Sequence, residues 1–112
     1  MRDSELRSLL RQVDGWHLVH RSLETATDKH QVISAIEKTW QFADFAQTMA
    51  FVNAVAHVAQ DMDHHPEMRV SYGRCTLLYT THDTGCLTLL DLEAAQRVNS
   101  LPLPLLQPKA GS

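Results

Sequence analysis

The chain reads IEKTWQFADFAQTMAFVNAVAHVAQDMDHHPEMRVSYGRCTLLYTT over residues 36–81, and its hydrophobic period changes twice along this stretch. From Ile36 to Phe42 apolar and polar residues alternate, which predicts a half-buried strand. Over residues 43–62 apolar residues recur at steps of three and four, which predicts a helix opened by Asp44 or by the turn before it. Pro66 prevents the helix from continuing. Its predicted core face consists of Phe45, Met49, Val52, Ala56 and Ala59.

The segments after Pro66 predict a hairpin followed by a helix. Residues 69–72 and 75–81 have strand composition, and the turn between them is expected at Gly73-Arg74. Thr88 is a predicted helix N-cap, and Asp91 three residues later completes a capping-box pattern. The apolar stripe of this last helix is Leu89, Leu92, Ala95 and Val98.

The segments before residue 36 predict a helix and a strand. A helical spacing of leucines ends at Asp14-Gly15, and residues 16–20 follow as a short strand. The polar residues 22–30 are compatible with a long hairpin loop or with extended strands. The order α-β-β-α-β-β-α predicts an α+β fold, a four-stranded antiparallel sheet with helices packed on one face. We expect one domain over residues 1–100 and an irregular tail over 101–112, which holds three of the four prolines.

Composition narrows the function classes. The chain has 112 residues, 44% of them hydrophobic, and a net charge of -3 without a basic run, which argues against nucleic-acid binding. No segment has the length and hydropathy of a membrane span or of a signal peptide. Two cysteines without a disulfide pattern favour a reducing compartment, so we expect a cytoplasmic protein with no membrane partner.

Three histidines form the candidate site. His64 and His65 lie at the predicted end of the long helix, and His82 follows the second strand of the hairpin. If the hairpin folds back, the three can meet, and imidazoles can then give and take protons near neutral pH. The alternative is structural, because histidines at a helix end also stabilise the last carbonyls. A metal site is disfavoured, because neither a C-x-x-C nor an H-E-x-x-H pattern is present.

The spacing of these residues resembles the signature of the pterin-4a-carbinolamine dehydratases, which are also dimerisation cofactors of a homeodomain transcription factor. Asp63-His64-His65-Pro66-Glu67, Tyr72, Thr81-His82-Asp83 and Asp91 carry the resemblance, which extends over residues 15–98. It implies loss of water from 4a-hydroxytetrahydropterin to give quinonoid dihydropterin, which recycles the tetrahydropterin, with neither metal nor cofactor. It also implies homodimers that extend the sheet across two subunits, or dimers of dimers.

The resemblance further implies residue roles. His64 and His82 would be the acid/base pair at the 4a-hydroxyl and N5, and His65 would hold and polarise the pterin. The predicted substrate contacts also include Asp63, Thr80, Thr81, Asp83 and Trp16. Trp16 is equally well explained as a packed anchor at the start of a strand. Asp91 is assigned to capping the last helix rather than to the substrate.

Departures from the family pattern keep a second function open. Gln60 replaces an acidic or otherwise charged residue, Met68 replaces a frequent aromatic, and Leu89-Leu90 replaces a polar pair. The loop between the first two strands is also longer. The alternative is a catalytically divergent binding protein, such as the dehydratase-like Rubisco assembly factors of carboxysomes, because one fold can serve several functions.

Overall fold

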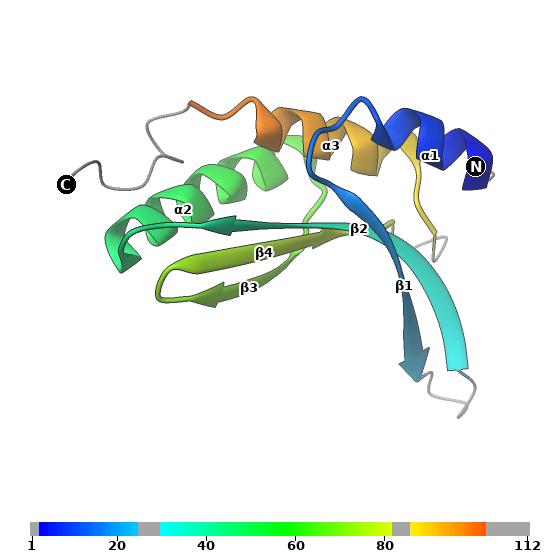
Figure 1. Cartoon of the computed structure of the whole chain (residues 1–112), viewed down its shortest axis with the longest axis horizontal. Helices are drawn as coiled ribbons and strands as arrows, with labels where there is room; N and C mark the ends of the chain where they lie inside the picture. The colour runs from blue at the N-terminus through cyan, green and yellow to red at the C-terminus, as the bar shows by residue number, and fades with distance from the viewer. Residues whose placement is uncertain (1–2, 25–29, 82–85, 103–112) are drawn as a thin grey trace.

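The structure is a computed structural model that describes residues 3–24, 30–81 and 86–102. Along the chain lie α1 (Asp3–Leu10), β1 (His17–Glu24), β2 (His30–Gln41), α2 (Phe45–Met62), β3 (Glu67–Ser71), β4 (Arg74–Tyr79) and α3 (Leu89–Asn99). The four strands form one antiparallel sheet in the order β1-β2-β4-β3. The helices cover one face of this sheet (Figure 1), so the predicted α+β architecture and its element order are confirmed.

β1 and β2 are longer than the alternation alone predicted. Leu23 pairs with Gln31 and Glu24 with His30, so both edges of the polar stretch are extended strand. The far ends of β1 and β2 pass beyond β3 and β4 and curve away from the helices (Figure 1). Of the two possibilities for residues 22–30, extended strands are therefore confirmed for the part that the structure describes; residues 25–29 lie outside it.

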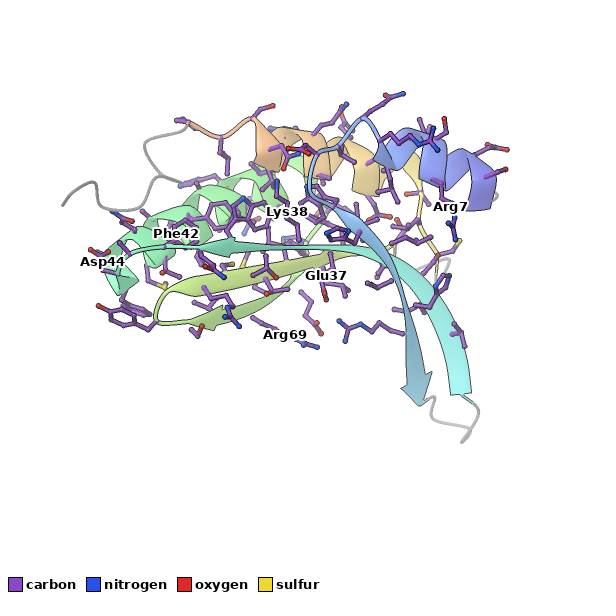
Figure 2. All side chains as sticks on the ribbon, in the orientation of Figure 1. Arg7, Glu37, Lys38, Phe42, Asp44 and Arg69 are labelled. Atoms are coloured by element: carbon purple, nitrogen blue, oxygen red, sulfur yellow. The ribbon has the colours of Figure 1, made fainter. Side chains whose placement is uncertain are left out.

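Side chains of β2 alternate between the two faces as predicted. Ile36 is fully buried and Phe42 is 8% exposed, and both belong to the core under the helices. Lys38 points toward the helix layer and Glu37 points to the opposite face (Figure 2). On that opposite face Glu37 forms an ion pair of 2.5 Å with Arg21 of β1.

The face of α2 that enters the core differs from the prediction. The residues of α2 that are buried are Thr48, Phe51, Val55, Val58 and Ala59. Phe45 is 50% exposed, Ala56 is exposed and Met49 and Val52 are half-buried, so of the predicted face only Ala59 is buried. The prediction was wrong because this helix carries apolar residues around most of its circumference, and periodicity alone then cannot select one side.

The β3–β4 turn lies one residue before its predicted position. Ser71 pairs with Arg74, so the two turn residues are Tyr72 and Gly73. The Gly73 carbonyl accepts a hydrogen bond of 2.8 Å from the amide of Phe42, which ties the turn to the end of β2. A Cβ atom on Gly73 would lie 2.8 Å from the Phe42 carbonyl oxygen, and this close backbone approach explains the glycine.

Candidate active site

The C-terminus of α2 turns the chain toward the sheet. Asp63 adopts a left-handed conformation with φ 50° and ψ 43°. Its amide donates to the carbonyl of Gln60 over 3.3 Å, and the amide of His64 donates to the carbonyl of Ala59 over 3.1 Å. These two bonds form the Schellman closure that helices use before a change of direction. Asp tolerates the left-handed region better than most residues do, so Asp63 can end the helix where glycine is usual.

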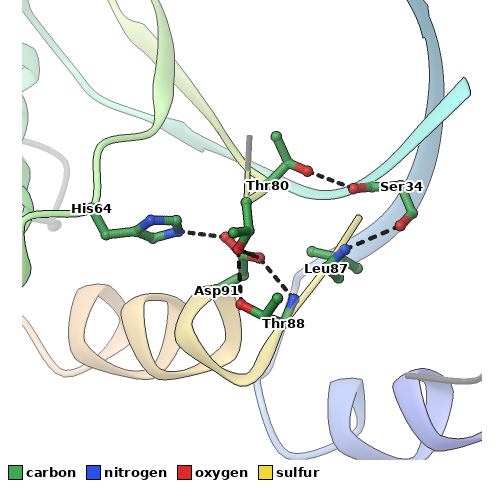
Figure 3. A network of polar contacts seen from close by, with 7 residues as sticks. Ser34, His64, Thr80, Leu87, Thr88 and Asp91 are labelled. Carbon is green, nitrogen blue, oxygen red and sulfur yellow. Dashed lines mark hydrogen bonds and ion pairs between the residues drawn. The ribbon is translucent and has the colours of Figure 1, made fainter. Parts of the chain in front are cut away.

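His64 is directed into the protein by this turn and contacts a carboxylate. Its side chain is 10% exposed, and its Nε2 lies 2.5 Å from Oδ1 of Asp91, which is fully buried in the first turn of α3 (Figure 3). A carboxylate accepts hydrogen bonds, so this contact favours a proton on Nε2, and in the neutral imidazole of that tautomer Nδ1 has the lone pair. Among the described residues nothing else bonds this ring, so Nδ1 is available to exchange a proton.

Asp91 serves the helix and the histidine at once. Its Oδ2 accepts a bond of 3.0 Å from the Thr88 amide and another of 2.8 Å from the Thr81 hydroxyl. The first bond belongs to the capping box that starts α3, so the predicted capping role of Thr88 and Asp91 is confirmed. The second bond fixes Asp91 to the chain just after β4. The carboxylate is thus held from three sides, and it in turn fixes the orientation of His64.

Tyr79 of β4 lies against the other side of His64. The two rings are stacked with centroids 5.6 Å apart and an interplanar angle of 18°. Tyr79 is fully buried, and its hydroxyl has no hydrogen-bond partner among the described residues. Burial, and then the neighbouring charge of Asp91, raises the pKa of Tyr79 to about 12, whereas Arg97 opposes the shift. Tyr79 therefore stays neutral and provides a flat wall behind the imidazole.

A cavity of about 460 Å³ opens in front of this arrangement. Its lining residues are Asp63, His64, His65, Pro66, Glu67, Thr81 and Leu90. The volume lies within the range of small-molecule sites. His65 and Glu67 are exposed at its edge, whereas His64 is buried at its base. The cavity thus combines one oriented imidazole with further groups able to form hydrogen bonds.

Four of the residues predicted for the site line this one cavity, namely Asp63, His64, His65 and Thr81. Two others lie elsewhere. The hydroxyl of Thr80 donates to the carbonyl of Ser34 over 2.8 Å, and Nε1 of Trp16 donates to Oδ1 of Asn99 over 3.0 Å in the core. Their predicted contacts with a substrate stay predictions.

His82 and Asp83, which were also predicted for the site, lie outside the described residues. The chain reaches the cavity at Thr81, immediately before them. Of the departures from the family pattern, Leu90 lines the cavity and Gln60 is exposed outside its lining, whereas Met68 packs against the core.

The contact of Asp91 with His64 was missed by sequence reasoning. The local pattern around Thr88 identifies a helix cap and gives no indication of a partner 27 residues earlier. The one sequence signal for this contact was that Asp91 belongs to the same family signature as the two histidines.

The described residues also bear on metal binding, thiol chemistry and membrane insertion. No group of three metal-ligating side chains occurs among the described residues. Cys75 is buried and Cys86 is exposed. No described helix is long and apolar enough to span a membrane.

Solved structures share this architecture. A transcriptional coactivator/pterin dehydratase from Brucella melitensis superimposes with a TM-score of 0.74 at 29% identity, over 96% of this chain and 98% of that one. A pterin dehydratase-like protein described as a RuBisCO assembly factor of the alpha-carboxysome superimposes with a TM-score of 0.54 at 19% identity, over 73% of this chain and 87% of that one. The second likeness concerns the fold alone.

Sequence relatives point to the same family. A relative from Xanthomonas campestris pv. campestris is 39% identical over 99 residues, 88% of this chain and 75% of its own length. One from Nitrosomonas eutropha is 39% identical over 102 residues, 90% of this chain and 79% of its own length. Both carry the name pterin-4-alpha-carbinolamine dehydratase. The model of the family described as pterin 4 alpha carbinolamine dehydratase matches residues 1–101, and this chain therefore belongs to that family.

Proposed function

We propose that this protein catalyses the dehydration of 4a-hydroxytetrahydropterin to quinonoid dihydropterin, and so returns tetrahydropterin cofactor to use. The single observation that carries the proposal is the His64–Asp91 contact of 2.5 Å at the base of a cavity of small-molecule size. Family membership and the names of the relatives support the reaction class.

The reaction requires one proton to be removed and one to be delivered. The C4a–O bond breaks and its oxygen leaves as water after gaining a proton, while N5 loses its proton and the C4a=N5 double bond forms. One group must therefore act as a base at N5 and another as an acid at the 4a-hydroxyl. We assign this pair to His64 and His82, and we assign His65 to holding the pterin.

The residues around His64 make its imidazole suitable for taking up a proton. Asp91 holds the proton on Nε2, so the lone pair of Nδ1 is available to take a proton. Uptake of a proton makes an imidazolium, and the adjacent buried carboxylate stabilises that charge more strongly than water would. The Tyr79 ring lies nearly parallel to the imidazole with the two centroids 5.6 Å apart, and so bounds the space beside it. The chain thus presents one fixed proton acceptor to the cavity.

The proposal is tested with chemically generated 4a-hydroxytetrahydropterin. Wild-type protein should accelerate its dehydration, and His64→Ala and His82→Ala should each lower turnover by about 10²-fold or more. His57→Ala is the matched control, because His57 is an exposed histidine of α2 outside the cavity lining. A folded wild type that gives no acceleration, or full activity in both histidine variants, would rule out the proposed chemistry.

The second candidate function is a binding role in the assembly of a larger complex. It is favoured by the fold likeness to the protein described as a RuBisCO assembly factor. The assay separates the two, because a binding protein would leave the rate unchanged and would instead co-purify with Rubisco subunits.

We also propose that the protein works as a homodimer or a dimer of dimers. β1 and β3 are the outer strands of the sheet and leave two edges that a second copy can pair with. Sedimentation of the purified protein measures this directly, and a monomer at micromolar concentration would refute it.

A further inference from the structure

A second hollow lies between α1 and β1, apart from the cavity beside His64. It has a volume of about 480 Å³, and its lining residues are Arg7, Leu10, Arg11, Trp16, His17, Leu18 and His20. None of these residues lines the His64 cavity. Arg7 extends from α1 toward the strands (Figure 2). The volume is again that of a small-molecule site.

The side chains of this hollow concentrate positive charge. Two of its seven lining residues are arginines, two are histidines and none is acidic, although the whole chain has a net charge of -3. His17 pairs with Glu37 and alternates with Leu18, so its side chain lies on the sheet face away from the helices, and His20 is the histidine on the side of Leu18. Other arginines of the protein are paired, such as Arg21 with Glu37 and Arg97 with Asp61. By contrast, the side chains of Arg7, Arg11, His17 and His20 form no hydrogen bond and no ion pair with any other side chain that the structure describes, a set that leaves out Asp3 and residues 22–31.

Folding stability does not explain this arrangement. Arg7 lies in α1 and Arg11 lies one residue after its end, and both line the same hollow, so their like charges repel each other. Arg7 lies in the last turn of α1, and the helix dipole favours a cation there. That effect does not account for the histidines of β1 that line the same hollow. A ligand of opposite charge would remove the repulsion between the two guanidinium groups.

The rest of the lining is apolar. Leu10 and Leu18 are half-buried, and Trp16 is 4% exposed. Leu10 and Leu18 pack against the hydrophobic core, so this part of the surface is fixed in place. An occupant would therefore contact cationic groups and a rigid apolar surface together.

We propose that the hollow between α1 and β1 binds a small organic phosphate, a phosphate monoester whose phosphate contacts Arg7 and Arg11 and whose apolar body lies on Leu10 and Leu18. Two guanidinium groups and the imidazole of His20 offer more donors than one carboxylate can accept, and a phosphate monoester offers three terminal oxygens where a carboxylate offers two. Guanidinium is also the side-chain group best matched to phosphate geometry. The proposal is independent of the chemistry at His64.

The test uses phenyl phosphate and inorganic phosphate as probes in NMR titrations of the full chain, with ionic strength held constant. Phenyl phosphate should bind saturably and about 10-fold more tightly than inorganic phosphate, because its ring covers apolar surface. The shifted amide signals should be those of the hollow, such as Leu10 and Leu18, and not those of His65 and Leu90. A double variant, Arg7→Gln with Arg11→Gln, should weaken the binding of phenyl phosphate by about 10-fold or more.

Arg74→Gln is the matched control, because Arg74 is an exposed arginine of β4 outside this hollow. It should change the affinity by less than about 2-fold, as expected for a distant exposed charge. Equal weakening by Arg74→Gln would show a general charge effect and overturn the proposal. So would the absence of saturation, shifts confined to the His64 cavity, or binding only to vesicles of anionic lipid. All three arginines are exposed, so the variants are expected to fold, and circular dichroism verifies this.

Discussion

Oδ1 of Asp91 lies 2.5 Å from Nε2 of His64, although 27 positions of the chain separate the two residues. The contact joins the end of α2 to the start of α3 and fixes the orientation of the His64 ring. In the proposed function, this oriented ring is the proton acceptor. The same contact also has a structural effect, because it fastens the end of α2 to the first turn of α3, and the assay of the histidine variants tests the proposed role of His64 in proton transfer.

Asp91→Asn should lower kcat of the dehydratase reaction by about 10²-fold. An amide can present its NH₂ group to His64, which would move the ring proton to Nδ1 and remove the base from the cavity. The pH profile of kcat should change as well, which a purely structural defect would not produce. Glu93→Gln on the exposed side of α3 is the matched control and should leave both quantities unchanged.

Tyr79→Phe should raise the free energy of unfolding by about 1 kcal/mol. The buried hydroxyl of Tyr79 has no partner among the described residues, and an unpaired buried polar group destabilises the folded state. Urea denaturation measures the change, and Tyr72→Phe is the control because Tyr72 is 67% exposed. A loss of stability greater than about 1 kcal/mol in Tyr79→Phe would mean that the hydroxyl is hydrogen-bonded.

The stability of the protein should fall between about pH 9 and pH 11, and Cys75 should contribute to this fall. Burial raises the pKa of its thiol from 9.0 to about 11. In that interval the unfolded chain loses the thiol proton while the folded chain keeps it, so rising pH favours unfolding. Denaturation at a series of pH values should show a shallower slope for Cys75→Ala. An unchanged slope would contradict the raised pKa.

Gly73→Ala should destabilise the fold by about 1–3 kcal/mol, because the new methyl group would meet the backbone carbonyl of Phe42 at 2.8 Å. The backbone carbonyl of Phe42, one residue after β2, cannot move aside as the end of a side chain can. Thermal unfolding should show the loss, and Ser71→Ala, an exposed change in the same hairpin, should show little. Equal stability of the two variants would mean that the turn can shift away from β2.

Much of the fold was predictable because its signals are local. Alternation in β2, the N-cap at Thr88 and the break at Pro66 each depend on residues close in sequence. The side of α2 that faces the sheet was not predictable in this way. Phe51 is buried and Phe45 is half exposed, and only the placement of α2 on the sheet distinguishes these two phenylalanines.

The candidate site also has a part that the sequence predicted and a part that it did not. His64, His65 and Thr81 could be named from their spacing, and the structure brings these three to one cavity. The second role of Asp91 could not be derived from its neighbours, because its bond to His64 depends on the packing of α3 against α2. Trp16 was predicted to contact the substrate, but its hydrogen bond to Asn99 ties it to α3 and it does not line the cavity.

Asp91 both caps α3 and orients His64, so local unfolding of the first turn of α3 on heating should disrupt the candidate site. The carboxylate that holds His64 is the same one that receives the Thr88 amide, so fraying of that turn releases both together. Helix ends open at lower free energies than a sheet does. On heating, the proposed proton transfer by His64 would therefore stop while the four strands were still intact. A substitution that stabilises the first turn of α3 would raise the temperature at which activity is lost.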